Sequence, residues 1–219
     1  MMVANHVRRA GIAAAIGVLG LAAVPLASQA APEALHYTIQ ASTCTTCFVA
    51  ANVDLFPGGA DDSVVEVALP FPVYVYGVKH TTAWVSSNGN IQFAGPGETT
   101  YDNTTLPSST LSPKGAVAPY WDDLIVEGSG SGTGVFSKST STEYVVSWRG
   151  TEVGTGNPVR AEVIFFKTSR TIEFNYIQGT AESATIGIQK AAGGPATQYS
   201  YDVSGATFDG LTLKFVPAS

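Results

Sequence analysis

From Ser63 onward, apolar residues recur at every second position of the chain, a pattern typical of half-buried β-strands. Val65, Val67 and Leu69 share one face of the first such segment, with Glu66 and Ala68 between them. No window after the N-terminal apolar run repeats with the 3.6-residue period of a helix. The same alternation predicts further strands at residues 144–148, 172–176, 184–188 and 211–215.

The connecting segments are rich in turn residues and predict hairpins between consecutive antiparallel strands. Asn88-Gly89 is the residue pair favoured in a type I′ turn, and it predicts a hairpin between residues 81–87 and 90–93. The composition of the glycine-rich run 128–134 also fits an interdomain linker, but strand-like segments flank it, so we interpret it as a hairpin loop. Two more turns are predicted at residues 167–170 and 191–196. Together these elements predict an all-β fold, an antiparallel β-sandwich of roughly ten strands in two packed sheets.

The N-terminus has the pattern of a secretory signal peptide. Arg8 and Arg9 precede an apolar run, residues 12–26, and small residues stand before a predicted cleavage after Ala30. A membrane anchor is the alternative, but about 15 apolar residues are short for a span that needs roughly 20. We therefore predict a secreted, extracellular protein with no membrane span after cleavage.

The predicted domain organisation has three parts. Residues 1–30 are the signal peptide, residues 31–62 are an N-terminal extension leading into the sandwich, and residues 63–219 form the β-sandwich domain. Loss of two arginines with the signal peptide changes the formal net charge from −6 to −8. Since phosphate binding depends on clustered cations, this acidic chain excludes nucleic acid and anionic membrane surfaces as expected partners.

The two cysteines of the chain, Cys44 and Cys47, lie close together in the N-terminal extension. In an oxidising extracellular space the expected state is a local disulfide. A redox pair or a structural zinc site is the alternative, but a zinc site needs four ligands and only His36 and His80 remain as mature histidines.

An ordered series of phrases resembles the nidogen-type (NIDO-like) extracellular β domain, which is also found in plexin-domain-containing proteins and in bacterial secreted proteins. The resemblance covers about residues 63–189 and is carried by LPFPVYVYG (69–77), VSSNGNIQF (85–93), APYWDDL (118–124), EYVVSWRG (143–150), and then AEVIFF, TIEFNY and ATIGIQ. It implies a cell-adhesion, recognition or surface-structural module without enzymatic activity of its own. The expected partner is an extracellular protein or a glycan.

The strand within LPFPVYVYG carries apolar or aromatic residues on both faces, which predicts a central or covered strand. If it is instead an exposed edge, it offers a pairing surface for a partner strand. Aromatic residues are also the main candidates for ligand contacts, although each is expected first to pack in the core. These candidates are Tyr74, Tyr76, Tyr101, Tyr120, Tyr199 and Tyr201.

Calcium is the one cofactor with candidate ligands, since oxygen-rich side chains gather in the predicted turns. These candidates are Asp122, Asp123, Asn88, Asn90 and Asp102. None follows the spacing of a calcium loop, and the alternative interpretation is turn capping, in which the carboxylates accept backbone N–H bonds.

A secreted glycoside or ester hydrolase is the alternative function, and it would depend on strand carboxylates, either glutamates or the paired Asp122 and Asp123. The candidate glutamates alternate with apolar residues, which predicts that they face solvent; they are Glu66, Glu143, Glu162 and Glu173. A serine triad would need His36 or His80, and the chain has no G-x-S-x-G turn. We therefore predict no catalytic residues and a protein that is not an enzyme.

Overall fold

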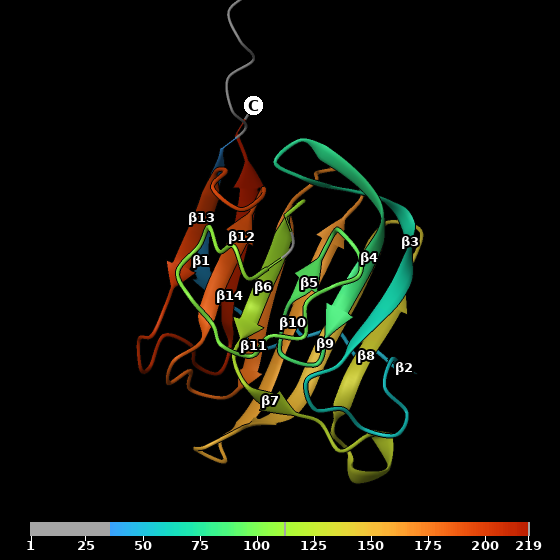
Figure 1. Cartoon of the computed structure of the whole chain (residues 1–219), viewed down its shortest axis with the longest axis vertical. Coiled ribbons are helices and arrows are strands. Elements are labelled where there is room, and N and C mark those ends of the chain that lie inside the picture. Colours follow the sequence, from blue (N-terminus) through green and yellow to red (C-terminus); the bar gives the residue numbers. More distant parts are fainter. Residues whose placement is uncertain (1–35, 112, 219) are drawn as a thin grey trace, which may run out of the picture. The chain divides into compact units, whose positions relative to one another are not determined.

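The computed structural model describes residues 36–111 and 113–218, and these residues form two antiparallel β-sheets packed face to face (Figure 1). The predicted all-β sandwich is confirmed. The sheets contain fourteen strands instead of roughly ten, in part because three are only two residues long. Within the described residues the helical structure is one short 3₁₀ turn, Ser129–Ser131. The predicted signal peptide, residues 1–30, lies outside the described residues.

The larger sheet has eight strands in the order β1-β14-β11-β10-β9-β8-β2, with β7 paired to the end of β9. Its strands are β1 (Tyr37–Thr43), β2 (Val53–Asp54), β7 (Leu124–Ile125), β8 (Gly134–Ser139), β9 (Glu143–Glu152), β10 (Pro158–Phe166), β11 (Ile172–Gln178) and β14 (Leu211–Pro217).

The smaller sheet has six strands in the order β13-β12-β6-β5-β4-β3. Its strands are β3 (Val64–Val75), β4 (Val78–Ser86), β5 (Ile91–Gln92), β6 (Ala116–Trp121), β12 (Thr185–Gln189) and β13 (Ala196–Ser200).

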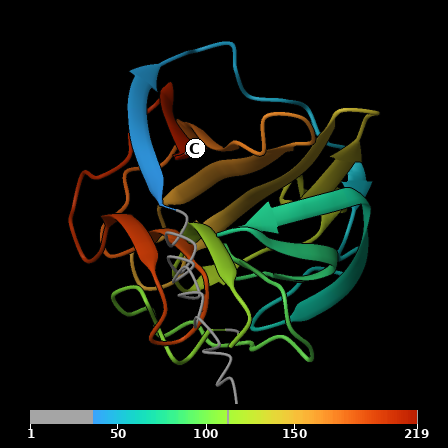
Figure 2. The ribbon, with the colours of Figure 1, turned by 90° about the horizontal axis from the view of Figure 1, so that it is seen from above.

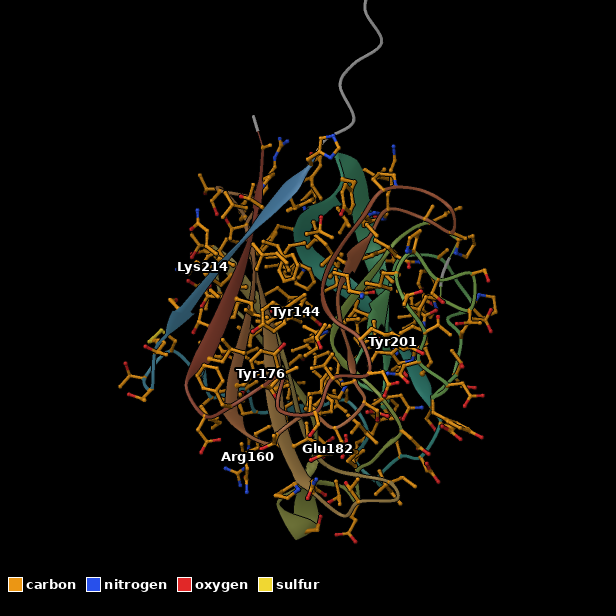
Figure 3. The ribbon with its side chains drawn as sticks, turned by 90° about the vertical axis from the view of Figure 1, so that its left-hand side faces the viewer. Tyr144, Arg160, Tyr176, Glu182, Tyr201 and Lys214 are labelled. Atoms are coloured by element: carbon orange, nitrogen blue, oxygen red, sulfur yellow. A yellow bond between two sulfur atoms is a disulfide. The ribbon has the colours of Figure 1, made fainter. Side chains whose placement is uncertain are left out.

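The core lies between the two sheets, where the alternating residues of each strand point inward. Tyr144, Val146 and Trp148 of β9 belong to one buried cluster with the apolar residues of β11 and β14, as the alternation predicts. Two aromatic side chains of this cluster also form hydrogen bonds across the sandwich. Trp148 Nε1 donates to the Ser86 carbonyl at 2.8 Å, and the Tyr176 hydroxyl donates to the Pro119 carbonyl at 2.7 Å. Figure 3 shows Tyr144 and Tyr176 between the layers.

β3, which contains most of LPFPVYVYG, is an edge strand of the smaller sheet, so the prediction of a central or covered strand is wrong. Its pairing with β4 breaks between Ala68 and Val73, and Pro70 and Pro72 occupy this break. Proline has no N–H to donate to a neighbouring strand and is therefore tolerated at an edge. The face opposite the core is covered in part by a cation, since the Arg170 guanidinium lies 4.1 Å from the ring centre of Tyr74.

Residues 37–54 bind to the larger sheet at both of its edges. β1 pairs with β14 at one edge and β2 pairs with β8 at the other, so residues 44–52 must cross the outer face of the sheet (Figure 2). We call residues 44–52 the strap. It contains the Cys44–Cys47 disulfide, with Cα atoms 5.5 Å apart, so the predicted bridge is confirmed.

The predicted turns are confirmed as connections, with two corrections of type. β4 and β5 form a hairpin around Asn88-Gly89, but only Gly89 has a positive φ, of 70°. A type I′ turn needs positive φ at both central residues, so the loop is a three-residue type that ends in a left-handed glycine. Residues 128–134 do not close a hairpin, because β7 and β8 pair with successive parts of β9 and not with each other.

Candidate functional site

Asn88 links three segments of the chain through its buried side chain. Its Nδ2 donates to Asp62 Oδ1 at 2.8 Å and to the Thr99 carbonyl at 3.2 Å, and its Oδ1 accepts the Leu124 N–H at 3.0 Å. Both ends of the amide are therefore used within the protein. Asn88 positions the neighbouring carboxylate of Asp62, and its side chain has a structural role.

Asn90 and Asp122, two other calcium candidates, also bond within the fold. Asn90 donates to the Asn88 carbonyl and accepts from Gln92. Asp122 Oδ1 accepts the Asp123 N–H at 2.9 Å, and its Oδ2 accepts the Ser183 hydroxyl at 2.8 Å. Asp122 thus has the capping geometry that was the alternative to a metal ligand.

The carboxylates that do approach one another belong to Asp61, Asp62 and Asp123, whose ligand oxygens lie within 4.8 Å of one another. Partial burial raises the pKa of Asp123, and the charges of Asp62, Asp61 and Asp102 raise it further. Of the calcium candidates predicted from the sequence, Asp123 belongs to this acidic cluster, and the negative charge of Asp102 acts on Asp123. Calcium prefers carboxylate oxygens as ligands, so the acidic cluster is the candidate calcium site among the described residues.

Asp61 and Asp62 were missing from the sequence prediction. They precede β3, and the bond from the Ser87 N–H to the Ser63 carbonyl, 2.8 Å, holds their loop beside the Asn88 turn. Only the register of β3 against β4 brings these positions together. The adjacent pair of aspartates was visible in the sequence, but its neighbours were not.

Neutralising one carboxylate of the acidic cluster is expected to stabilise the metal-free protein. In the presence of a chelator, Asp61→Asn should raise the melting temperature by about 1–3 °C, because repulsion between partly exposed charges is worth less than about 1 kcal/mol. Asp209→Asn, at an exposed aspartate outside the cluster, is the matched control and should leave the melting temperature unchanged. A calcium titration of both proteins then tests the calcium prediction. A wild-type melting temperature that calcium does not move would end it.

Asp122 and Glu152 form a buried pair of carboxyl groups at the ends of β6 and β9, with 7% and 2% of their surfaces exposed. The Tyr120 hydroxyl donates to Glu152 Oε1 at 3.2 Å and the Thr155 hydroxyl to Oε2 at 2.6 Å. Burial raises the pKa of Asp122 to about 6, and the charge of Glu152 adds to this effect. A glycosidase needs two carboxyl groups that both reach a bound sugar. This pair is closed off and bonded internally, so it does not support the hydrolase alternative.

Glu162 and Glu173 were predicted to face solvent, and this prediction is wrong, because both are buried: the strap covers Glu162, and Glu173 pairs with Lys214 and accepts from Asn175. Glu162 is fully buried, and its Oε1 and Oε2 accept the Val49 N–H of the strap at 3.0 and 3.1 Å. Asn175 Nδ2 donates to both glutamates and to the Cys47 carbonyl. Burial raises the pKa of Glu162 to about 7 despite these donors.

His80, the candidate base of a triad on β4, is stacked on Phe93 with ring centres 4.4 Å apart. Burial lowers its pKa to about 4, and the charge of Lys114 lowers it further. The ring is therefore a neutral packing residue of the smaller sheet at physiological pH. It shares no hydrogen bond with a serine among the described residues, which leaves the serine-triad variant of the hydrolase without support.

A groove of about 350 Å³ opens between β1 and β13, at one side of the sandwich. We call it the edge groove. Tyr199 on β13 and Phe208 in the following loop line it and remain 37% and 46% exposed. The other lining residues are Ala41, Ser42, Thr43 and Leu211, so no charged side chain lines it. Tyr199 was a sequence candidate for ligand contact; Phe208 was missed because it lies in an irregular loop.

The other tyrosine candidates are distributed differently. Tyr120 and Tyr76 are buried, the latter with its hydroxyl 2.6 Å from that of Thr197. Tyr101 is 44% exposed in the loop before β6 and does not line the edge groove. Among the described residues, no helix has the length and apolar character needed to cross a membrane.

A comparison with protein-family models finds a match over most of the chain. Residues 36–214 match the model of the family described as NIDO related, which covers most of the chain and all but the last residues of β14. The resemblance to a nidogen-type domain is thereby confirmed. No curated protein and no solved structure matches this chain.

Proposed function

Because the chain belongs to the NIDO-related family, we propose that it is a secreted, non-enzymatic recognition module that binds an extracellular protein or a glycan. The family suggests an extracellular domain of the structural or adhesion type. The single observation that carries the proposal is the edge groove, where two exposed aromatic rings border an uncharged depression.

The edge groove has the chemistry of a recognition site. Exposed aromatic side chains contribute large contact areas at a small cost in conformational entropy, and they stack on sugar rings or pack against apolar side chains. Tyr199 and Phe208 come from different elements, and both line one concave surface. The buried carboxyl groups of the fold, in contrast, are closed to substrates, which favours binding over catalysis.

Removing either groove ring is expected to weaken binding to the partner by about tenfold or more, the loss typical of a central aromatic contact. Purified mature protein should be screened against extracellular matrix proteins and a glycan array, and Tyr199→Ala and Phe208→Ala compared with wild type on the hits. Tyr101→Ala is the matched control, because it removes an exposed tyrosine outside the edge groove. A partner that all three variants bind as tightly as wild type would refute the groove as the binding site.

A further inference from the structure

β1 leaves one row of backbone groups without partners among the described residues. The Ala218 N–H donates to the His36 carbonyl at 2.7 Å, and the Cys44 N–H donates to the Gly210 carbonyl at 2.6 Å. In an antiparallel pair the residues that bond the neighbour alternate with residues that do not. Even-numbered residues of β1 therefore bond toward β14, and Ile39, Ala41 and Thr43 direct their N–H and C=O groups outward.

The other edge strands of the two sheets are either shorter than β1 or interrupted by residues that hinder pairing with another strand. β2 has two residues. β3 carries Pro70 and Pro72 where its ladder is broken. β13 has five residues and an irregular register with β12. β1 has seven residues, YTIQAST, with no proline, no charge and an unbroken register with β14. Proteins normally block such an edge, so an unblocked one is a template for another strand.

The outward row of β1 borders the edge groove. Ala41 and Thr43 contribute lining atoms to the groove as well as outward backbone groups. A strand added beside β1 would place alternate side chains toward Tyr199 and Phe208, since successive side chains of a strand point to opposite faces. Backbone pairing and a side-chain pocket thus occur together, the combination that binds extended peptides in other β domains.

We infer that the edge groove binds an extended polypeptide segment, which adds as a strand to β1 and inserts an apolar side chain between Tyr199 and Phe208. The inference rests on the proposed recognition function and names its ligand class. Free donors and acceptors that repeat every second residue match another backbone in extended conformation. The groove offers no charged side chain, and the chain is acidic with a formal net charge of −6, so the segment is uncharged or basic.

A display library of linear seven-residue peptides, selected on wild-type mature protein, provides the probe. We expect enriched peptides with apolar residues at alternate positions. Amide hydrogen exchange measured by NMR should show new protection at Ile39, Ala41 and Thr43 on binding. Thr38, Gln40 and Ser42 should change little, because they already bond β14. This alternation distinguishes strand addition from contact through side chains alone.

Ala41→Pro is the decisive variant, because it removes an outward N–H and leaves the bonds to β14 intact. It should weaken the selected peptides at least tenfold. Gln40→Thr, at the exposed neighbour whose backbone already bonds β14 and which does not line the edge groove, should bind within about threefold of wild type. Melting temperatures of both variants check the fold, and the exchange pattern of the wild type tests the inference if Ala41→Pro is unstable.

The inference would be overturned by a selection that enriches no peptide, or by peptides that Ala41→Pro still binds as tightly as wild type. A dimer in sedimentation that Ala41→Pro abolishes would also overturn it, because the edge would then belong to a second copy. Glycan binding that depends on Tyr199 and Phe208 without protection of the β1 amides would also overturn it. That last result would leave the proposed recognition function standing.

Discussion

Replacing Gly89 with alanine is expected to lower the free energy of unfolding by more than about 4 kcal/mol, a large part of the roughly 5–15 kcal/mol that is typical of folded domains. A Cβ at this position would overlap the carbonyl oxygen of Tyr120 and lie 2.6 Å from its carbonyl carbon. The Tyr120 N–H donates to the Gly89 carbonyl at 3.1 Å, so the turn and β6 are held together where the methyl group would go. Both clashing atoms are backbone, and neither can rotate away.

Gly77→Ala is the matched control, since it separates the steric clash from the backbone conformation. Gly77 has a φ of 76°, close to the 70° of Gly89, but a Cβ there would meet no atom within 4 Å. Its substitution should cost only the strain of a left-handed alanine, about 1 kcal/mol. Urea denaturation of both variants measures the difference. Equal losses would mean that the β4–β5 turn is not packed against β6 as the structure has it.

The Gly89 case shows how far the turn was predictable. Asn88-Gly89 marks a hairpin from sequence alone, because glycine is the residue that tolerates positive φ. The close approach of Tyr120 depends on β5 pairing with β6, about 25 residues later in the chain. A local pattern contains no information about that pairing. The hairpin was therefore predicted and the reason for its glycine was not.

The alternation of apolar residues predicted the inner faces of β9, β11 and β14 well, because one side of each strand faces a packed layer. The same pattern failed for the outer face of the larger sheet. Glu162 and Glu173 alternate with apolar residues, as solvent-facing residues do, yet they are buried. The cover of Glu162 is the strap, which is distant in sequence and has no regular structure of its own, and Glu173 is covered in part by Lys214 of β14. The alternation of apolar residues predicts a strand, but it does not predict which other segments of the chain cover that strand.

The strap contacts this outer face through hydrogen bonds and through apolar packing. Glu162 accepts the Val49 N–H, Asn175 donates to the Cys47 carbonyl, and Arg149 donates to the Ala51 carbonyl at 3.2 Å. A small apolar cluster adds to these bonds; its members are Ala51, Phe136, Val145 and Ile164, with Val49 and Phe166 packed against them. The strap is thus part of the core of the domain, although it links two edge strands.

Raising the pH from 5 to 8 is expected to destabilise the wild-type protein by roughly 2–3 kcal/mol relative to Glu162→Gln. The pKa of Glu162 is about 7 in the folded protein, against an ordinary value of 4.5. Between these values the folded state holds a proton that the unfolded state has released. The stabilisation by this proton is complete below pH 4.5 and is lost as the pH rises through 7.

The prediction concerns the difference in stability between wild type and Glu162→Gln, because other buried groups change their protonation in the same pH range. The raised pKa of Asp122 acts in the same direction as that of Glu162, and the lowered pKa of His80 acts in the opposite direction, since folding is weakened as the pH falls toward 4. Both effects cancel between wild type and Glu162→Gln. Glu66→Gln, at an exposed glutamate on β3, controls for the change of residue and should alter stability by less than about 0.5 kcal/mol.

The charged groups around Glu162 determine the size of this effect. The charge of Glu173 raises the pKa of Glu162, and that of Arg149 lowers it. Lys214, on the outer side of the sheet (Figure 3), pairs with Glu173; its Nζ lies 3.3 Å from Glu173 Oε2. Burial is nonetheless the largest cause, and the strap contributes to that burial. Urea titrations at several pH values measure the difference directly. A constant difference from pH 5 to 8 would mean that water reaches Glu162, and therefore that the strap does not lie closed over the sheet in solution.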